Sequence, residues 1–540
     1  MKDERVLILG LGASGLAMAR WCARQGAQVR VWDSRHPAPG APGATGAPDS
    51  GDTAPHADTL AREWPAVQVF GGALTGASLG DATLVLKSPG LAPGDERIAP
   101  LMLEARTRDV PVQGELDCFV KALAALKAEH GYAPRLVAIT GTNGKTTTTA
   151  MTALIVERTG RRVGLAGNIG PTLLDTLAAA EAAGEALPDV WVMELSSFQL
   201  EGGGRGVEGF EPDAAAVLNV TQDHLDWHGS MAAYAQAKSR IYGRHAVMVV
   251  NRDDALVEAM VPQPPAAAEG RAKGKAPKWT PRHVVRFGLD APRQPGDFGL
   301  VQEGGMAWLV RALPDEEGTR KRGERAAHDE PAELHLQRLM PADALRVRGR
   351  HNAANALAAL ALATAIGCPL APMLHGLREY AGEPHRVQFI ASVGGVEAYD
   401  DSKGTNVGAT VAALEGLGAD KSPAKLVVIL GGDGKGQDFA PLAVPCARHA
   451  RAVATLGRDA EAIEQALAGV AGAAGANGVP LQRHATLEAA TAWCFEQAQP
   501  GDAVLLSPAC ASLDMFRNYA HRAEVFVQAV QALAAARGEV

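Results

Sequence analysis

The sequence has few cysteines, few aromatic residues and no long hydrophobic run. Its six cysteines are scattered and form no CxxC pair, which favours reduced core thiols over a disulfide framework. No apolar run approaches the roughly 20 residues of a membrane span, and the first residues, MKDERVLILGLG, lack the apolar core of a signal peptide. We therefore expect a cytoplasmic protein without a transmembrane segment.

A basic surface is also missing. The net charge is −8, and the one segment rich in lysine and arginine, GTRKRGERAAHDEP, mixes charges of both signs. This balance predicts that nucleic acid is not a partner. It remains compatible with a small anionic ligand, because glycine loops and helix N-termini bind phosphate locally whatever the global charge.

Alternating strand-like and helix-like patterns are present along the whole chain. Apolar runs such as LVAIT, VWVMEL and LVVILGG alternate with helix-like segments such as NAANALAALALATAIG. This alternation predicts an α/β fold of mostly parallel sheets covered by helices. Because 540 residues exceed a single core, we predict three domains, at residues 1–109, 110–381 and 382–540.

Three segments are expected to be loops or insertions. Residues 37–56 and 262–279 are dense in proline, glycine and alanine, and residues 314–331 are highly charged. Such compositions bury little apolar surface, and we assign these segments no function.

The segment VLILGLGASGLA predicts a strand, a glycine turn and a helix near the start of the chain. Gly10, Gly12 and Gly15 have the GxGxxG spacing, and Asp33 follows a second apolar run. This layout is typical of a dinucleotide site and raises the question of an oxidoreductase. A lone GxGxxG is weak support for that function, because the same turn suits any pyrophosphate.

The segment LVAITGTNGKTTTTAMTALIVERTG is the strongest chemical signal. A strand ends in a glycine loop that is followed by Lys145, Thr146 and a helix. Backbone N–H groups of such a loop surround phosphates, the lysine neutralises their charge and the first hydroxyl binds Mg²⁺. The spacing is GxxGKT, with Ile139 where the first glycine of a standard P-loop would stand. A second phosphate site in a separate domain fits an ATP-driven enzyme better than a dehydrogenase.

Other candidates follow strands of the middle segment. Glu194 ends the run VWVMEL, and His224 lies in LNVTQDHLD just past another strand. Ligands gather at the carboxyl ends of parallel strands, and Mg²⁺ prefers oxygen ligands such as that of Glu194. His224 is a less usual Mg²⁺ ligand and could instead cap the loop. Lys238, taken alone, is expected to be an exposed lysine on the surface of a helix.

Several motifs, taken in their order along the chain, resemble those of a known family. They are AITGTNGKTTT, GNIG, ELSSFQL, LNVTQDHLD, YAQAKSRIY, GRHNAANALAA, EPHRVQ, DDSKGTN, LGGDGKGQDF and LLSPACASLDMFRNYAHR. Together they resemble the Mur ligases, and among them the branch that adds D-glutamate to UDP-N-acetylmuramoyl-L-alanine in peptidoglycan synthesis. The last two motifs separate this branch from its relatives.

The resemblance implies a fold and a reaction. It implies a Rossmann-like N-terminal domain that binds the UDP of the substrate rather than NAD, a P-loop-type central ATPase domain and a Rossmann-like C-terminal domain. It also implies that ATP phosphorylates the substrate carboxylate, and that the amine of D-glutamate then attacks the acyl phosphate. The expected cofactors are ATP, two Mg²⁺ ions and a carbamylated lysine, and the expected state is a monomer.

Catalytic, nucleotide and metal roles carry over by position. The implied catalytic residues are Lys145, His224 and Lys238. The implied metal ligands are Thr146, Glu194, His224 and Lys238 as its carbamate. The implied ATP contacts are Gly141, Thr142, Asn143, Gly144, Lys145, Thr146, Thr147, Asn355, Arg386, Asp401 and Lys403.

Contacts to the other two substrates carry over in the same way. The implied contacts to the UDP-linked substrate are Ala13, Ser14, Asp33, Ser34, Arg35, Ser88, Gly90 and Asn168. The implied contacts to D-glutamate are Thr405, Lys435, Ser512, Leu513 and Tyr519. One departure is visible, because the position of Tyr519 is often phenylalanine in the family. If its ring packs closely, its hydroxyl must find a partner.

Three alternatives remain at this point. Another Mur ligase or a folylpolyglutamate synthase would share the middle motifs, but SPACASLD and GGDGKGQDF argue against both. An NAD-dependent oxidoreductase with an accessory ATPase domain would offer no role for Lys435 or Ser512. A non-catalytic nucleotide-binding module is disfavoured by the presence of Lys145, Glu194 and Lys238 together.

Overall fold

The structure is a computed structural model, and its described residues are 2–37, 56–92, 94–204, 206–264, 279–314, 334–347, 349–470 and 478–539. The central parts of the three expected loop segments lie outside the described residues. Among the helices that are described, none combines the length and apolar character needed to cross a bilayer.

The first sheet has five parallel strands in the order β3-β2-β1-β4-β5. Its strands are β1 (Arg5–Leu9), β2 (Gln28–Trp32), β3 (Gln68–Phe70), β4 (Leu84–Lys87) and β5 (Val112–Gln113). Its helices are α1 (Ala13–Arg24), α2 (Ala57–Glu63) and α3 (Ala99–Thr107). The edge strand β5 follows the expected boundary at Asp109, so we place the end of this unit after Gln113.

The central sheet has six parallel strands in the order β11-β10-β9-β6-β8-β7. They are β6 (Arg135–Thr140), β7 (Val163–Gly167), β8 (Val190–Glu194), β9 (Ala214–Val217), β10 (Val247–Asn251) and β11 (Val284–Phe287). The helices are α4 (Glu115–His130), α5 (Lys145–Glu157), α6 (Leu173–Ala182), α7 (Ser197–Glu201), α8 (Leu225–His228), α9 (Met231–Ser239), α10 (Ala255–Glu258), α11 (Arg350–Ala365) and α12 (Leu370–Glu379).

A small antiparallel sheet follows the central one and was not expected. Its strands are β12 (Phe298–Glu303), β13 (Met306–Pro314) and β14 (Leu334–Pro341). Gly304 and Gly305 join β12 to β13 with φ of 59° and 80°. A two-residue glycine turn of this kind is a hairpin signal, so the sequence did contain a sign of this sheet.

The last sheet has the order β15-β16-β20-β17-β18-β19, with only β15 antiparallel to its neighbour. The strands are β15 (Gln388–Val393), β16 (Val396–Asp400), β17 (Leu426–Gly431), β18 (Ala450–Leu456), β19 (Leu481–Arg483) and β20 (Ala503–Leu506). The helices are α13 (Val407–Lys421), α14 (Ala443–His449), α15 (Ala460–Ala466), α16 (Leu487–Gln497) and α17 (Tyr519–Ala536).

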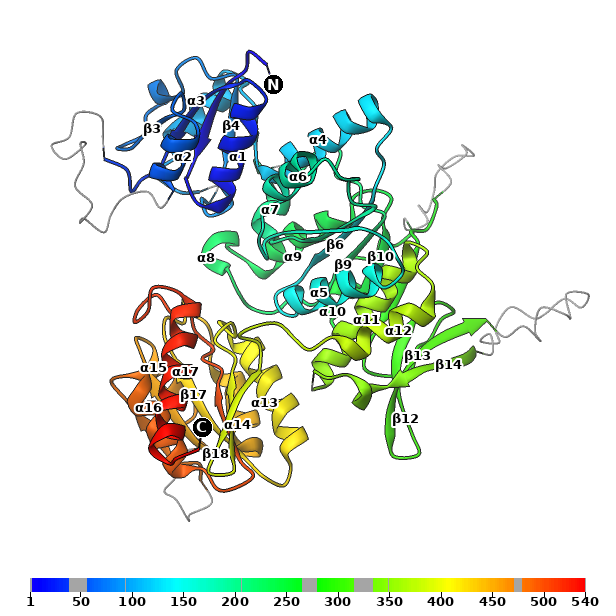
Figure 1. Ribbon diagram of the computed structural model, residues 1–540, viewed down its shortest axis with the longest axis vertical. Coiled ribbons are helices and arrows are strands. Elements are labelled where there is room, and N and C mark those ends of the chain that lie inside the picture. The colour runs from blue at the N-terminus through cyan, green and yellow to red at the C-terminus, as the bar shows by residue number, and fades with distance from the viewer. Residues whose placement is uncertain are drawn as a thin grey trace, which may run out of the picture.

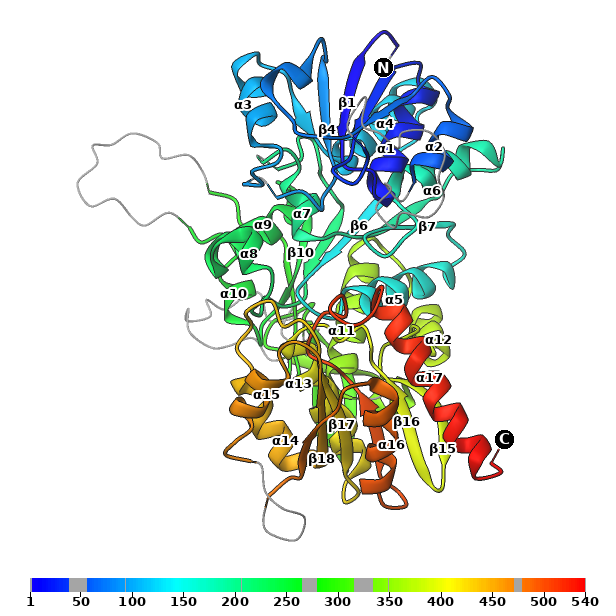
Figure 2. The same ribbon diagram turned by 90° about the vertical axis from the view of Figure 1, so that its left-hand side faces the viewer.

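The prediction of an α/β fold with mostly parallel sheets is confirmed. Figures 1 and 2 show the three large sheets following one another along the long axis, with the first sheet at one end and the last at the other. One apolar cluster runs from the first sheet through α4 and α6 into the central sheet. The last sheet packs on clusters of its own.

The helix α1 approaches β1 most closely at Gly15. A Cβ added to Gly15 would lie 1.9 Å from the carbonyl oxygen of Gly10, whereas one added to Gly12 would meet nothing within 4 Å. We expect Gly15→Ala to lower the free energy of unfolding by about 1–3 kcal/mol, because the helix must move away from the strand. Gly12→Ala is the matched control and should change it by less than about 0.5 kcal/mol. Thermal unfolding of both variants tests this, and equal losses would contradict it.

Candidate functional site

The turn between β6 and α5 forms a compact phosphate-sized loop. Gly144 has a φ of 80°, and a Cβ on it would lie 2.6 Å from Oδ1 of Asn355. Nζ of Lys145 folds back and donates to the carbonyl oxygens of Gly141 and Thr142, both at 2.8 Å. Burial lowers the pKa of Lys145. The loop therefore holds a cation against its own carbonyl groups, where an anion could replace them as the partner.

A pocket of about 320 Å³ opens beside this turn. Its volume lies at the lower end of the roughly 300–1,000 Å³ that is typical of ligand sites. Apolar side chains, including Phe287 and Leu289, cover one part of it, as a planar base would require. Several predicted ATP contacts line the rest: Asn143, Gly144, Thr147, Asn355, Arg386 and Asp401.

Contacts across the chain bring the last sheet onto the turn. A guanidinium nitrogen (Nη2) of Arg386 donates to Oγ1 of Thr146 at 2.7 Å. Nδ2 of Asn406 donates to Oδ1 of Asn143 at 3.0 Å. Within the described part of the chain, the buried Nε of Arg386 has no acceptor. Arg386 therefore has a spare donor for a phosphate oxygen beside the turn.

Glu194 lies directly behind Thr146. It is 2% exposed, and Oε2 accepts a hydrogen bond from the Thr146 hydroxyl at 2.8 Å. Oε1 accepts one from Nδ2 of Asn168 at 2.9 Å. Asn168 was predicted to contact the UDP-linked substrate, and here its side chain orients the acid. Among the described residues there is no group of three or more His, Cys, Asp and Glu residues that could hold a metal.

Lys238 is buried rather than on the surface. It is 1% exposed, its Nζ donates to the carbonyl oxygen of Gly141 at 2.8 Å, and it lies 4.5 Å from the ring centre of Tyr234. Burial and the charge of Lys145 hold the pKa of Lys238 well below its ordinary value. The interpretation as a surface lysine is thus wrong, and the burial of Lys238 beside the turn between β6 and α5 favours its unprotonated amine.

His224 lies at the start of α8 with a φ of 53°. Its ring packs edge-to-face against Phe198, with centroids 4.8 Å apart. Burial lowers the pKa of His224, the neighbouring Asp223 opposes this, and nearby cations including Lys435 add to it. Burial and the nearby lysines therefore both favour the neutral form of the His224 imidazole.

A second pocket, of about 560 Å³, lies at the first glycine turn. It contains the predicted UDP contacts Ala13, Ser14, Asp33, Ser34, Arg35, Ser88 and Gly90. Arg97 also lines it, and its Nη1 donates to Oγ of Ser34 at 3.3 Å. Arg97 was not predicted, because nothing in its local sequence connects it to the turn.

The acid of this turn has its own protein partners. Burial raises the pKa of Asp33, but hydrogen bonds from the Arg35 side chain and the Leu11 N–H outweigh it and lower the pKa to about 2. In NAD sites an acid at this position binds a ribose. Here the carboxylate holds Arg35 at the pocket, which favours an anionic ligand.

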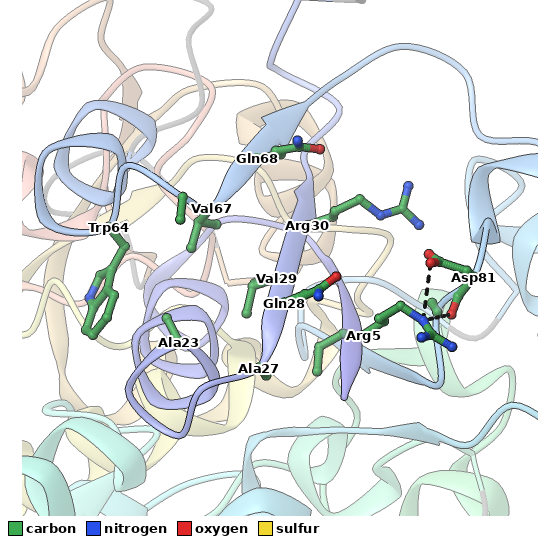
Figure 3. Close-up of a pocket in the computed structure, with 13 residues that line it drawn as sticks. Arg5, Ala23, Ala27, Gln28, Val29, Arg30, Trp64, Val67, Gln68 and Asp81 are labelled. Atoms are coloured by element: carbon green, nitrogen blue, oxygen red, sulfur yellow. Dashed lines mark hydrogen bonds and ion pairs between the residues drawn. The ribbon is translucent and has the colours of Figure 1, made fainter. Parts of the chain in front are cut away.

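A third pocket lies at the opposite, amino end of the same strands. It has a volume of about 440 Å³ and is lined by Arg5, Gln28, Arg30 and Trp64, among others (Figure 3). Arg5 is paired with Asp81, and Arg30 donates to the backbone oxygen of Leu79 at 2.9 Å. Its charged groups thus bind the protein itself, and we assign this pocket no ligand.

The predicted D-glutamate contacts lie at the carboxyl edge of the last sheet. Lys435 is exposed with a φ of 51°, Ser512 is buried and Leu513 is exposed. The Tyr519 ring faces His385 and lies 5.5 Å from Nζ of Lys403. The ring of Tyr519, and not only its backbone, therefore takes part in this region.

Three family models match the chain. They are the "Mur ligase MurD-like, N-terminal domain" at residues 4–114, the "Mur ligase middle domain" at residues 139–277 and the "Mur ligase, glutamate ligase domain" at residues 385–510. Two curated relatives are both named UDP-N-acetylmuramoylalanine–D-glutamate ligase. The one from Albidiferax ferrireducens is 56% identical over 100% of this chain and 98% of its own length. The one from Burkholderia mallei is 55% identical over 99% and 98%.

Solved structures of lower identity share the fold. The UDP-N-acetylmuramate–alanine ligase of Thermotoga maritima superposes with a TM-score of 0.53 at 19% identity, covering 98% of this chain and 99% of its own. The MurF ligase of Thermotoga maritima in complex with ADP superposes with a TM-score of 0.54 at 15% identity, covering 98% and 96%.

Asp401 lines the pocket beside the turn between β6 and α5, and its buried carboxyl group makes the stability of the protein depend on pH. Burial raises its pKa to about 7, although a hydrogen bond from Ser507 and the charge of Arg386 oppose this. The folded protein then binds more protons than the unfolded chain from about pH 4 to 7. The stability that protonated Asp401 contributes therefore falls over this range and is lost once the pH has risen through about 7. We expect Asp401→Asn to be nearly as stable as the wild type at pH 5 and relatively more stable at pH 8.

Thermal unfolding at both pH values measures this difference. Asp438→Asn is the control, because Asp438 is exposed. It should leave the pH dependence unchanged. A parallel pH response of Asp401→Asn and the wild type would contradict the prediction.

Proposed function

Because the chain belongs to the Mur ligase family, we propose that it joins D-glutamate to UDP-N-acetylmuramoyl-L-alanine with the energy of ATP. It is an amide-bond-forming, ATP-dependent ligase of peptidoglycan synthesis. The observation that carries the proposal is the single site formed by two halves of the chain. Arg386, which precedes β15, donates to Thr146 of the turn, and Asp401, which follows β16, lines the pocket beside it.

The chemistry requires that a poor electrophile be activated. The γ-phosphate of ATP passes to the alanine carboxylate, which forms an acyl phosphate and releases ADP. The unprotonated amine of D-glutamate attacks the acyl carbon, phosphate leaves, and the amide nitrogen loses a proton. The protein has to neutralise phosphate charge and orient the reactants. Lys145 and Arg386 supply the charge, and the spare Nε–H of Arg386 supplies a donor.

Thr146 and Glu194 fit the first shell of Mg²⁺. Their oxygens lie 2.8 Å apart behind the phosphate turn. Mg²⁺ keeps several waters and phosphate oxygens as ligands, so that one or two protein oxygens suffice. When bound, the ion would offset negative charge on the phosphates. We place a second ion toward His224 and Lys238, with Lys238 as its carbamate.

The environment of Lys238 supports the carbamate. Carbamate formation joins the amine nitrogen to the carbon of CO₂ and releases one proton, so it needs an unprotonated amine. Burial holds the pKa of Lys238 well below its ordinary value, which favours that unprotonated amine. The product is an oxygen-rich anion near the phosphate turn, where a lysine cation would repel a metal.

The binding sites of the other two substrates, the compartment and the oligomeric state remain to be assigned. We assign the 560 Å³ pocket to the UDP of the substrate, because it opens at the first glycine turn, whose backbone suits a pyrophosphate. Arg35 and Arg97 line the same pocket, and Asp33 and Asp95 hold their guanidinium groups there. We assign D-glutamate to Thr405, Lys435, Ser512, Leu513 and Tyr519. We propose a cytoplasmic monomer. All six cysteines lie in the described residues, are buried and form no disulfide, as is usual for proteins of reducing compartments.

The amino-acid substrate is tested by phosphate release from ATP in the presence of UDP-N-acetylmuramoyl-L-alanine. We expect release with D-glutamate and none with L-glutamate, L-alanine or meso-diaminopimelate, because the proposed D-glutamate site must match two carboxylates and one chirality. Release with another amino acid would move the protein to a sister activity. No release with any of them, together with tight NAD binding, would overturn the ligase assignment.

The carbamate is tested by carbon-13 NMR of the protein in labelled bicarbonate. We expect one carbamate resonance in the wild type and its loss in Lys238→Met. Lys87→Met is the matched control, because burial also lowers the pKa of Lys87, to about 8, while its Nζ donates to the Leu91 carbonyl away from the phosphate turn. A signal that survives in Lys238→Met, or that disappears in Lys87→Met, would contradict the assignment.

A further inference from the structure

Glu115 is a buried acid at the junction of the first and central sheets. It is the first residue of α4 and is 2% exposed. Its Oε2 accepts a hydrogen bond from the hydroxyl of Ser14 at 2.8 Å. Its Oε1 accepts one from the backbone N–H of Leu174 at 3.1 Å. One side chain therefore connects the glycine turn of the UDP pocket to the first turn of α6.

The groups that contact the Glu115 carboxyl are hydrogen-bond donors, and such bonds depend on direction. Burial raises its pKa, the bonds from Ser14 and the α6 backbone oppose this, and Asp175 adds repulsion. A buried acid of this kind contributes little net stability, because an apolar side chain could fill the same volume without the cost of desolvation. What an apolar side chain cannot do is hold the Ser14 hydroxyl and the α6 backbone in one geometry.

The link continues toward the turn between β6 and α5, beside the 320 Å³ pocket. Helix α6 follows the loop that carries Asn168, and Asn168 donates to Glu194 at 2.9 Å. Glu194 in turn accepts from Thr146 at 2.8 Å. Ser14, which lines the 560 Å³ pocket, and Thr146, whose neighbour Thr147 lines the 320 Å³ pocket, are thus joined by hydrogen bonds and one short loop. The substrate has to span these pockets, with UDP in one and its carboxylate near the other.

We propose that Glu115 is a positioning residue for the UDP-linked substrate, which orients Ser14 at the pyrophosphate and sets the glycine turn relative to the central sheet. This inference rests on the proposed function, since it takes the first pocket as the UDP site. Glu115 touches neither the pocket nor the reacting atoms, and it acts through Ser14 and α6. Sequence reasoning did not single it out, because its partners lie 101 and 59 residues away.

The test compares two substitutions that fill the same volume. Glu115→Met removes both acceptors, whereas Glu115→Gln keeps an acceptor for Leu174 and can donate to Oγ of Ser14. We expect Glu115→Met to weaken UDP binding by about tenfold, in line with the loss of hydrogen bonds to a charged group. The KM for the UDP-linked substrate should rise as much, while the KM values for ATP and D-glutamate stay within about twofold. Glu115→Gln should restore both values.

Asp117→Met is the matched control. Asp117 is a buried acid two residues along α4, and it accepts from the Gly114 N–H at 2.8 Å without contacting Ser14. It should leave UDP binding within about twofold, because it removes a cap at the same helix end but not the link. Titration calorimetry with UDP measures binding, and thermal unfolding measures stability.

The outcomes separate the inference from the function on which it rests. Wild-type protein that binds no UDP would refute the UDP site itself. Wild-type UDP affinity in Glu115→Met would overturn the positioning role alone, as would a Glu115→Gln variant as weak as Glu115→Met. A Ser14→Ala background gives a further check, because Glu115→Met should then cause a much smaller loss. If Glu115→Met folds poorly, Glu115→Leu, which also removes both acceptors, takes its place in both backgrounds.

Discussion

The carboxyl ends of parallel strands lie at the same edge of a sheet, and the candidate sites of this protein depend on that constraint. Thr140 and Glu194 end β6 and β8 of the central sheet, and Asp400 ends β16 of the last sheet. Gly10 and Asp33 directly follow strands of the first sheet. The carboxyl edges of the central and last sheets face one another. Arg386, just before β15, donates a hydrogen bond to Thr146 at the start of α5. Residues that follow or precede strands of both sheets, among them Asn143, Arg386 and Asp401, line one pocket there.

The two junctions between the large sheets differ in their physical character. The first and central sheets share one apolar cluster, which is reinforced by polar links through Glu115 and Arg20. The last sheet has its own apolar clusters and meets the phosphate turn through polar contacts such as that of Asn406. Polar contacts of this kind resemble transient interfaces. The last sheet is therefore the part that we expect to open and close during turnover.

Burial and long-range partners explain where sequence interpretation was incomplete. Lys238 lies on a helix of mixed character, and only the tertiary structure shows that it is buried, where it packs against Tyr234 and donates to Gly141. Arg97 and Glu115 lie far along the chain from the turn that they serve. The hairpin of β12 and β13 was missed although its paired glycines are a local signal.

The sequence by itself determined the α/β class, the two glycine turns and the motifs that carry the ligase chemistry. These features are local, because strand, turn and helix signals depend on neighbours within a few residues. Only the tertiary structure decided that Arg386 reaches Thr146, that Asp401 is buried enough for its pKa to reach about 7, and that Glu115 joins two sheets. Those properties depend on contacts between distant segments and on exclusion of water, which no local pattern encodes.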